Sequence, residues 1–454
     1  MPFRSALSKM PKATGPLGPE ISIVINSNGR RENLATTLEA LRFQTYRHFE
    51  ICVVCGPAPD GTREFIAERA AAGALKAADC DEPNLSVSRN IGIALAAGEF
   101  VAFIDDDAIP EPVWLEQLLA SFGDDALVAG VGGMVFQPNG RDLQFRFSTC
   151  DRFGNARHDI EGPTDASAFP LSAHFPHVMG TNAMFRRQAL VAVGGFDEEY
   201  DYYLDEADLC CRLVDAGYAI RQRGDAPVHH QFLGGAVRDG EGITAHFYPI
   251  LKNQLYFSLV NGRSHATLPQ ILDSARDFAA RHRTDLASHV ARGALHRQAL
   301  VDFDEDHDRA TSVALSRGLS GARRLPDKAR FDAPPAFLLA GPLASGDERS
   351  RHVVIVAQEG GGASLAVEGA RTRVRELAEA GIFARVLVLA PRSRMREGVA
   401  LREGVWHHVV SGGDARDEAA PLAAALRRIA SYHPVGAVED PSGCLAARKA
   451  DACA

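Results

Sequence analysis

From Ile21 onward, short apolar runs alternate with segments of helical periodicity. The runs ISIVIN, FEICVVC and EFVAFI are dominated by apolar residues, which is typical of strands buried on both faces of a parallel sheet. Between them, RENLATTLEALRFQ places Leu34, Leu38 and Leu41 on one helical face. This alternation predicts an α/β fold in which helices flank a mainly parallel sheet. The predicted strands are 21–26, 49–55 and 99–104, and the predicted helices are 31–44, 62–74 and 86–98.

Polar or small residues follow each predicted strand. Asn26 and Ser27 end the first strand, and Cys55 and Gly56 end the second. The third strand runs into three consecutive aspartates, 105–107, within FVAFIDDDAIP. Ligands of open parallel sheets bind beyond the carboxyl ends of the strands. We therefore expect these three strand ends to converge on one site.

The pattern changes twice more along the chain. A charged stretch from about 268 to 325 has mostly helical character, which as a rule means a solvated surface. From His352, a strand, a glycine cluster at 360–362, a helix and a second strand begin another βαβ unit. We therefore expect a flexible tail at 1–19, a main domain at 20–265, a helical extension and linker at 266–350, and a small, partial Rossmann-like domain at 351–454.

Composition and charge exclude several classes of protein. The 454 residues are 46% hydrophobic and 24% charged, as in an ordinary globular protein. The net charge of -9 gives no general attraction to nucleic acid or acidic membranes. The eight cysteines have no disulfide or zinc spacing, and no apolar run is long enough for a signal peptide or a transmembrane helix. We expect a cytoplasmic protein with free thiols, with peripheral association at the inner face of a membrane left open.

The three aspartates allow two interpretations. In an extended segment Asp105 and Asp107 face one side and Asp106 faces the other. Two carboxylates on one side of a strand end suit Mg²⁺ or Mn²⁺, which bridge carboxylates to substrate phosphates. A polar turn that caps the next helix would show the same residues, and this motif alone does not separate the two.

Two further segments carry candidate chemistry. Asp205 and Glu206 lie near the predicted start of a helix in YYLDEADLCCRL, where acidic residues favour the helix dipole. A carboxylate of this pair is also a candidate for accepting a proton from an attacking hydroxyl. His229 and His230 in APVHHQF are structural residues by default, but next to two acidic clusters either one becomes a candidate metal ligand.

Taken together, these segments resemble glycosyltransferase family 2, the inverting nucleotide-sugar transferases of GT-A fold. The resemblance covers roughly residues 21–257, and any one segment would be a weak signal, whereas the ordered set is strong. It favours a binding site over a capping turn at the aspartates. The matching segments are ISIVINSNGRRENLATTLEAL, FEICVVCGPAPDGT, NLSVSRNIGIALAAGEFVAFIDDDAIP, MGTNAMFRRQAL, GGFDEEYDYYLDEADLCCRL and VHH.

The resemblance implies a role for each matching residue. Glu206 falls on the position of the catalytic base, where aspartate is commoner, and the local order leaves Asp205 as a rival. Asp105 and Asp107 match the DXD pair of the metal site, which His229 or His230 would complete. The implied cofactor is Mg²⁺ or Mn²⁺, and the implied donor is a UDP- or dTDP-sugar. The residues implied to bind the nucleotide sugar are Ser27, Arg89, Asp105, Asp106, Gly180, Thr181 and Asn182.

Two departures limit these implications. The second strand lacks the acidic pair that recognises the base, since VVCGPAPDGT has Cys55 and Gly56 there. The C-terminal segments VVIVAQEGGG and ARTRVRELAEAGIFARVLVLAPR resemble only the opening of a GT-B glycosyltransferase. Too little chain follows them to build the second, nucleotide-binding GT-B domain. We therefore interpret this part as a remnant or an acceptor-docking domain.

The sequence thus predicts a metal-dependent inverting glycosyltransferase that moves one sugar to a hydroxyl of a glycan, lipid-linked or protein acceptor. Surface polysaccharide or glycoconjugate synthesis in bacteria is the pathway that the family implies. Two alternatives remain: a non-catalytic scaffold of GT-A fold, and a sugar-1-phosphate nucleotidyltransferase. The nucleotidyltransferase is disfavoured because INSNGRREN lacks the glycine-rich loop that such enzymes carry after the first strand.

Overall fold

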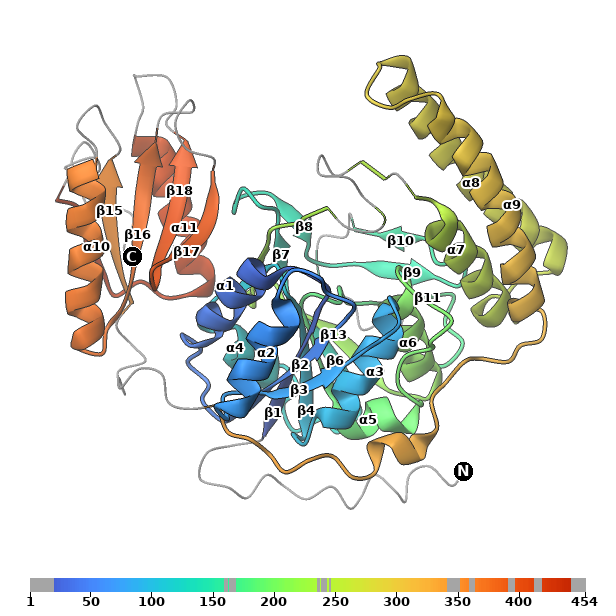
Figure 1. The fold of residues 1–454 in the computed structure, drawn as a ribbon, viewed down its shortest axis with the longest axis horizontal. Helices are drawn as coiled ribbons and strands as arrows, with labels where there is room; N and C mark the ends of the chain where they lie inside the picture. The colour runs from blue at the N-terminus through green and yellow to red at the C-terminus, as the bar shows by residue number, and fades with distance from the viewer. Residues whose placement is uncertain are drawn as a thin grey trace.

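The computed structural model describes residues 20–158, 162, 169–234, 237, 243–244, 246–340, 352–358, 364–390, 397–411 and 419–441. The expected tail at 1–19 and the glycine cluster at 360–362 lie outside these residues. Figure 1 shows a central sheet flanked by helices, a helical hairpin at one end and a second, smaller sheet at the other.

The central sheet has seven strands in the order β13-β6-β12-β4-β1-β2-β3. The pairs β4-β1, β1-β2, β2-β3 and β13-β6 are parallel, whereas β12 runs antiparallel to both of its neighbours. The sheet is therefore mainly parallel, which confirms the predicted α/β class. Its strands are β1 (Ile21–Ser27), β2 (Phe49–Cys55), β3 (Lys76–Asp79), β4 (Phe100–Asp105), β6 (Val128–Gly132), β12 (Ala183–Arg186) and β13 (Ala219–Gln222).

Helices cover both faces of this sheet, which explains why β1, β2 and β4 are mostly apolar. On one face, α1 (Arg31–Leu41), α2 (Thr62–Ala71) and α4 (Trp114–Ala120) pack against alternate residues of β1, β2 and β4. On the other face, the same strands contact α3 (Leu85–Leu95), α5 (Arg187–Ala192) and α6 (Asp205–Asp215).

The strand register brings the predicted strand ends together. Asn26 of β1 lies opposite Asp105 of β4, and Ser27 lies opposite Cys55 of β2. The loops that follow β1, β2 and β4 therefore leave the sheet at one edge, as expected from the sequence.

Two small sheets extend beyond that edge, and their short strands give no clear sequence pattern. The four-stranded one, in the order β5-β14-β7-β8, joins the segment after the aspartates to the histidine pair. The other has the order β10-β9-β11. The bounds are β5 (Ala108–Pro110), β7 (Val135–Phe136), β8 (Leu143–Phe145), β14 (Val228–His230), β9 (Thr149–Asp151), β10 (Ala156–Arg157) and β11 (His174–Pro176).

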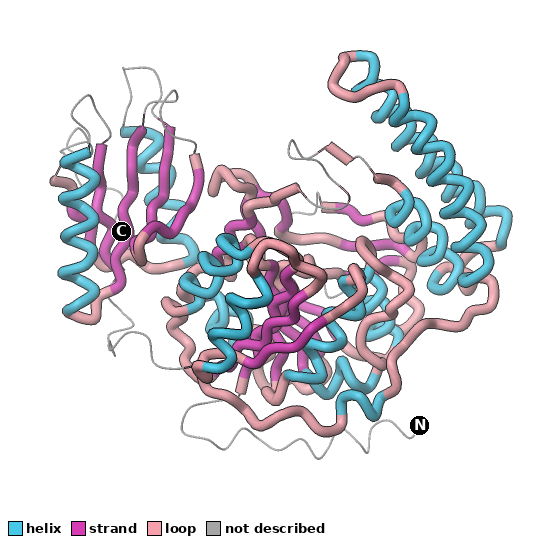
Figure 2. Tube along the Cα trace, in the orientation of Figure 1, coloured by secondary structure: helices cyan, strands magenta, loops and turns pink. Residues whose placement is uncertain are grey.

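Long helices follow the central sheet, as the charged stretch predicts. Helix α7 (Tyr248–Asn261) packs against α9 (Gln298–Gly318), which forms a hairpin with α8 (Leu268–Ala291) (Figure 2). Residues 319–340, with the short 3₁₀ helix η3 (Lys328–Phe331), return along the base of the sheet. There the Leu338 backbone N–H donates to Glu50. Within the described residues, none of the helices is long and apolar enough to cross a membrane.

The second sheet lies in residues 352–441, which we call the C-terminal module. Its strand order is β17-β18-β16-β15-β19, and every pair except β17-β18 is parallel. Two apolar clusters cover its two faces, one with α10 and one with α11. The elements are β15 (His352–Gln358), α10 (Ser364–Glu379), β16 (Phe383–Ala390), β17 (Gly398–Arg402), β18 (Val405–Ser411), α11 (Ala419–Tyr432) and β19 (Ala437–Glu439).

Candidate active site

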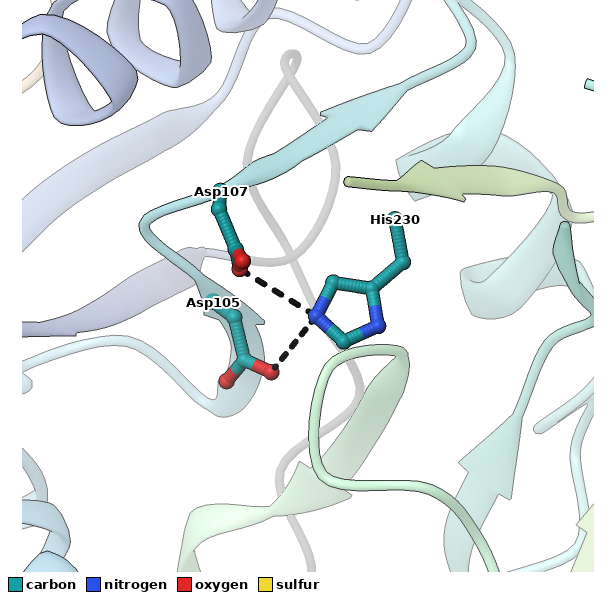
Figure 3. A group of neighbouring side chains, drawn as sticks. All are labelled: Asp105, Asp107 and His230. Carbon is teal, nitrogen blue, oxygen red and sulfur yellow. Dashed lines mark ion pairs between the residues drawn. The ribbon is translucent and has the colours of Figure 1, made fainter. Parts of the chain in front are cut away.

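Three side chains from two parts of the chain meet at the carboxyl end of β4 (Figure 3). Asp105 ends β4, Asp107 follows it in a turn, and His230 ends β14. His230 Nε2 lies 3.2 Å from Asp107 Oδ1 and 3.7 Å from Asp105 Oδ2. The structure thus brings the expected pair of carboxylates together with one of the two candidate histidines.

Strand geometry decides which histidine joins the aspartates. Successive side chains of β14 face opposite sides, so His229 and His230 point apart. His230 faces Asp107, whereas His229 Nε2 lies 2.8 Å from Glu111 Oε1 and its ring stacks on Phe136. His229 is only 1% exposed and belongs to a separate buried contact.

Asp106 follows β4 in the same turn as Asp107, and it does not belong to the group formed by Asp105, Asp107 and His230. The Ser27 hydroxyl donates a hydrogen bond of 2.6 Å to Asp106, and Arg30 Nη1 lies 3.2 Å from Asp106 and 3.3 Å from Asp107. Burial raises the pKa of Asp106 to about 7, against the opposing effects of Arg30 and Ser27. Burial also acts to raise the pKa of Asp107, but the hydrogen bond and charge of His230, with Arg30, lower it below its ordinary value. Asp107 is therefore the more strongly ionised carboxylate.

The start of α6 forms a second acidic group. Arg89 on α3 pairs with Asp205, and its Nη1 lies 3.7 Å from Glu206 Oε2. The side chain of Asp205 is 1% exposed, whereas that of Glu206 is 25% exposed. Burial and the neighbouring Asp205 carboxylate raise the pKa of Glu206 well above its usual range. Asp205 is thus buried in an ion pair with Arg89, and Glu206 is the more accessible of the two carboxylates.

A strained turn holds these carboxylates in place. Tyr203 and Leu204, directly before α6, have φ values of 78° and 67°, which lie in the left-handed region. Such residues cost on the order of 1–3 kcal/mol each and persist where the surrounding structure holds them. Asn253 on α7 holds the turn in this conformation, because its Nδ2 donates to the carbonyl oxygens of Tyr202 and Tyr203.

The three consecutive residues that the resemblance implies for nucleotide-sugar binding, 180–182, have different environments. A Cβ at Gly180 would lie 2.1 Å from Arg89 Nη2, so only glycine lets Arg89 reach Asp205 without a shift. Thr181 Oγ1 accepts a hydrogen bond of 3.4 Å from the Asp105 backbone N–H. Asn182 is fully buried, and its amide bonds to Trp114 and to two backbone carbonyls.

A cleft of about 540 Å³ adjoins the aspartates. The ends of β1, β2 and β4, the loops before α3 and α6, and the segment after His230 line it. Of the predicted site residues, Ser27, the three aspartates and His230 belong to the lining, whereas Arg89, Glu206 and residues 180–182 do not. Tyr202, four residues before Glu206, also belongs to the lining.

Comparison with known proteins finds a family that is similar to this part of the chain. Residues 22–194, which contain the three aspartates, match the model of Glycosyl transferase family 2. These residues are therefore similar to glycosyltransferase family 2, and we use the name family 2 domain for the main domain of residues 20–265 that contains them. The matched segment ends before α6 and β14, so the family match itself does not include Glu206 or the histidine pair.

Relatives of the family 2 domain are similar over about half of this chain. A pre-mycofactocin glycosyltransferase from Mycobacterium tuberculosis is 28% identical over 221 residues, which are 48% of this chain and 44% of that protein. A glucosyl-dolichyl phosphate glucuronosyltransferase from Haloferax volcanii is 28% identical over 235 residues, which are 47% of this chain and 70% of that protein. The chain thus spans less than half the length of the mycobacterial relative.

Solved structures also resemble the chain. A mannosyltransferase from Pyrobaculum calidifontis, in complex with GDP-Man and Mn2+, covers 69% of this chain and 92% of its own. Its sequence identity is 16% and its TM-score is 0.41, a level at which the likeness supports no conclusion about function.

The residues of the family 2 domain fit a divalent cation. Gln144 Oε1, which can only accept, lies 2.9 Å from His230 Nδ1, so a neutral His230 is protonated there and turns the Nε2 lone pair toward the carboxylates. Asp107 Oδ1 is buried, and it faces His230 Nε2 at 3.2 Å. Two carboxylates and one imidazole nitrogen suit Mg²⁺ or Mn²⁺. Asp105, Asp107 and His230 are thus the residues that would hold the cation.

Sequence reasoning missed three residues of this region. Arg30 pairs with two of the aspartates, Gln144 orients His230, and Glu111 bonds His229. Arg30 and Glu111 had a usable signal, because each lies within or beside a segment that resembles the family. Gln144 lies in a short strand without a motif, and only the pairing of the small sheet reveals it.

Proposed function

We propose that this chain is a metal-dependent inverting glycosyltransferase that moves one sugar from a nucleoside-diphosphate sugar to an acceptor hydroxyl. The observation that carries the proposal is the cluster of Asp105, Asp107 and His230 at the wall of the cleft. A bound Mg²⁺ or Mn²⁺ would offset the charge that develops on the leaving nucleoside diphosphate.

The residues of the chain supply the remaining steps in this proposal. Ser27 and Asp106 lie at the carboxyl ends of β1 and β4, where the nucleotide is expected to bind. Glu206 accepts the proton of the acceptor hydroxyl, which attacks the anomeric carbon from the side opposite the leaving group. Its raised pKa strengthens it as a base, and Arg89 and Asp205 hold it in position.

The finer parts of the proposal follow the family. We propose a UDP- or dTDP-sugar donor, a glycan, lipid-linked or protein acceptor, and a place in bacterial surface polysaccharide or glycoconjugate synthesis. The expected cytoplasmic location is part of the same proposal.

Asp107→Ala tests the proposal. With wild type, we expect Mn²⁺-dependent hydrolysis of at least one member of a nucleotide-sugar panel, and thermal stabilisation by UDP or dTDP that needs Mn²⁺. We expect Asp107→Ala to reduce the rate of Mn²⁺-dependent hydrolysis by at least about 100-fold, because the variant loses an ionised metal ligand. The Mn²⁺-dependent thermal stabilisation by UDP or dTDP should fall as well. Asp308→Ala is the matched control, because Asp308 is 90% exposed on α9. Near-normal hydrolysis by Asp107→Ala would contradict the proposal, and a wild type that binds nucleotide without turnover of any donor would favour the scaffold.

A further inference from the structure

A buried ion pair joins the C-terminal module to the small sheet of the candidate active site. Arg385 lies near the start of β16, and its two Nη atoms lie 3.0 Å and 2.6 Å from the two carboxylate oxygens of Glu111. Both side chains are 0% exposed. Apolar contacts surround the pair, because Ile109 of β5 packs with Val399 and Trp406 of the module.

The pair is part of a larger polar contact. Arg385 Nε donates to His352 at 2.9 Å, and Arg385 Nη2 lies 3.4 Å from His433 Nδ1. On the other side, Glu111 Oε1 also lies 2.8 Å from His229 Nε2. One guanidinium group of the module thus pairs with Glu111 of the family 2 domain, and Glu111 in turn contacts His229.

Stability alone does not account for this arrangement. Taking two charges out of water is expensive, and well-packed apolar residues of similar size are often at least as stabilising as a buried ion pair. A bidentate pair instead fixes distance and orientation, because both oxygens and both nitrogens must align. The contact is therefore suited to setting the position of β5 and β14 relative to each other.

Two of the three candidate metal ligands lie in or directly beside these two strands: His230 ends β14, and Asp107 immediately precedes β5. Glu111 follows β5 directly, and β5 begins one residue after Asp107. His229 precedes His230 in β14, which pairs with β5. A shift of Glu111 or His229 therefore moves the backbone that carries Asp107 and His230. The loss of a partner that hydrogen-bonds a metal ligand directly typically weakens metal binding about 10- to 100-fold. Arg385 acts one step further out, through Glu111 and His229.

We propose that Arg385 is a positioning residue for the metal site, so that the C-terminal module completes the active site of the family 2 domain in cis. This inference rests on the proposed function, because it concerns the same metal site. It assigns the module a role in metal binding, rather than that of a remnant or an acceptor-docking domain.

The test compares Mn²⁺ binding by three variants of the full chain, followed by electron paramagnetic resonance of free Mn²⁺. Arg385→Met leaves Glu111 unpaired, and the double variant Glu111→Leu/Arg385→Met removes both charges and keeps the contact apolar. Arg373→Met is the matched control, because Arg373 makes a bidentate pair with Glu439 on the exposed side of the same module. Circular dichroism verifies that each variant is folded.

We expect Arg385→Met and the double variant to bind Mn²⁺ about 10-fold or more weakly than wild type and Arg373→Met. Mn²⁺ affinity equal to that of wild type in folded Arg385→Met overturns the inference. A folded double variant with wild-type Mn²⁺ affinity overturns it as well. Should Arg385→Met fail to fold, the double variant decides alone. A wild type that binds no Mn²⁺ contradicts the proposed function itself, so the two failures are distinguishable.

Discussion

At the scale of single residues, the partner of a carboxylate decides what it can do. Asp205 and Glu206 are adjacent, yet Asp205 is buried against Arg89 and Glu206 remains partly exposed. A proton acceptor needs access to its substrate and a pKa near the working pH. The structure therefore favours Glu206 over Asp205 as the base of the proposed reaction.

Glu206→Gln tests this assignment. We expect kcat to fall by about 10²- to 10⁴-fold, the usual contribution of a general base, with Mn²⁺ and nucleotide affinities unchanged. In wild type the carboxylate form is the active one and its pKa is raised, so kcat/KM should fall as pH decreases through a value above 4.5. Glu206→Asp should keep this pH dependence at reduced rate. Near-normal turnover by Glu206→Gln, or an acid limb at or below pH 4.5, would argue against the assignment.

At the scale of elements, the segment after α9 holds α6 in place. Arg323 Nη1 lies 2.6 Å from Asp208 and 3.2 Å from Asp197, and its Nη2 donates to Asn261 on α7. Asp208 is buried in α6, one turn from the Asp205–Glu206 pair. Burial acts to raise the pKa of Asp208, but Arg323 and Arg212 lower it to about 2. One arginine from residues 319–340 thus joins α6 to α7.

Arg323→Met should destabilise the fold by about 3–5 kcal/mol, because it leaves two buried carboxylates without their main cation. The measurement is the free energy of unfolding from urea titration at neutral pH. Arg317→Met serves as the control, since Arg317 is 67% exposed and lies 3.8 Å from its partner Glu199. A loss below about 1 kcal/mol for Arg323→Met would contradict this role.

At the scale of the whole molecule, histidines gather where the C-terminal module meets the family 2 domain. His433 stacks on His352 with ring centroids 4.1 Å apart, and both contact Arg385. Burial and the charge of Arg385 lower the pKa of His433 from 6.5 to about 4. The pKa values of His352 and His408 are also lowered, and burial is the main cause. The contact between the two parts therefore requires neutral imidazoles.

Stability should consequently fall as the solution becomes acidic. The folded pKa of His433 is below its unfolded value, so its contribution is complete above pH 6.5 and is lost as pH falls toward 4. The loss for this residue is on the order of 3 kcal/mol. Thermal melts of the full chain from pH 7.5 to 4.5 measure it, and His433→Asn should show a shallower decline. Equal slopes for the two proteins would rule out this contribution.

The local pattern of the sequence was sufficient to predict the strands and helices that surround the candidate site. Strands and helices with strong periodicity appeared as expected, because burial on both faces of a parallel sheet demands apolar strands. The position of Asp105 at a strand end followed directly, and so did its place beside the end of β1, where it lies opposite Asn26. Weak elements were not predictable, since β3, β5 and β14 have only three or four residues each.

The choice between His229 and His230 depends on tertiary structure, because both imidazoles have the same local sequence and only strand pairing orients them. The same is true of Arg385 and Glu111, which are 274 residues apart and lie within or beside apolar stretches. Local periodicity determines which segments form strands and which residues end them. Long-range packing determines which polar side chains meet, because a buried charge acquires its role only from the partner that the fold brings to it.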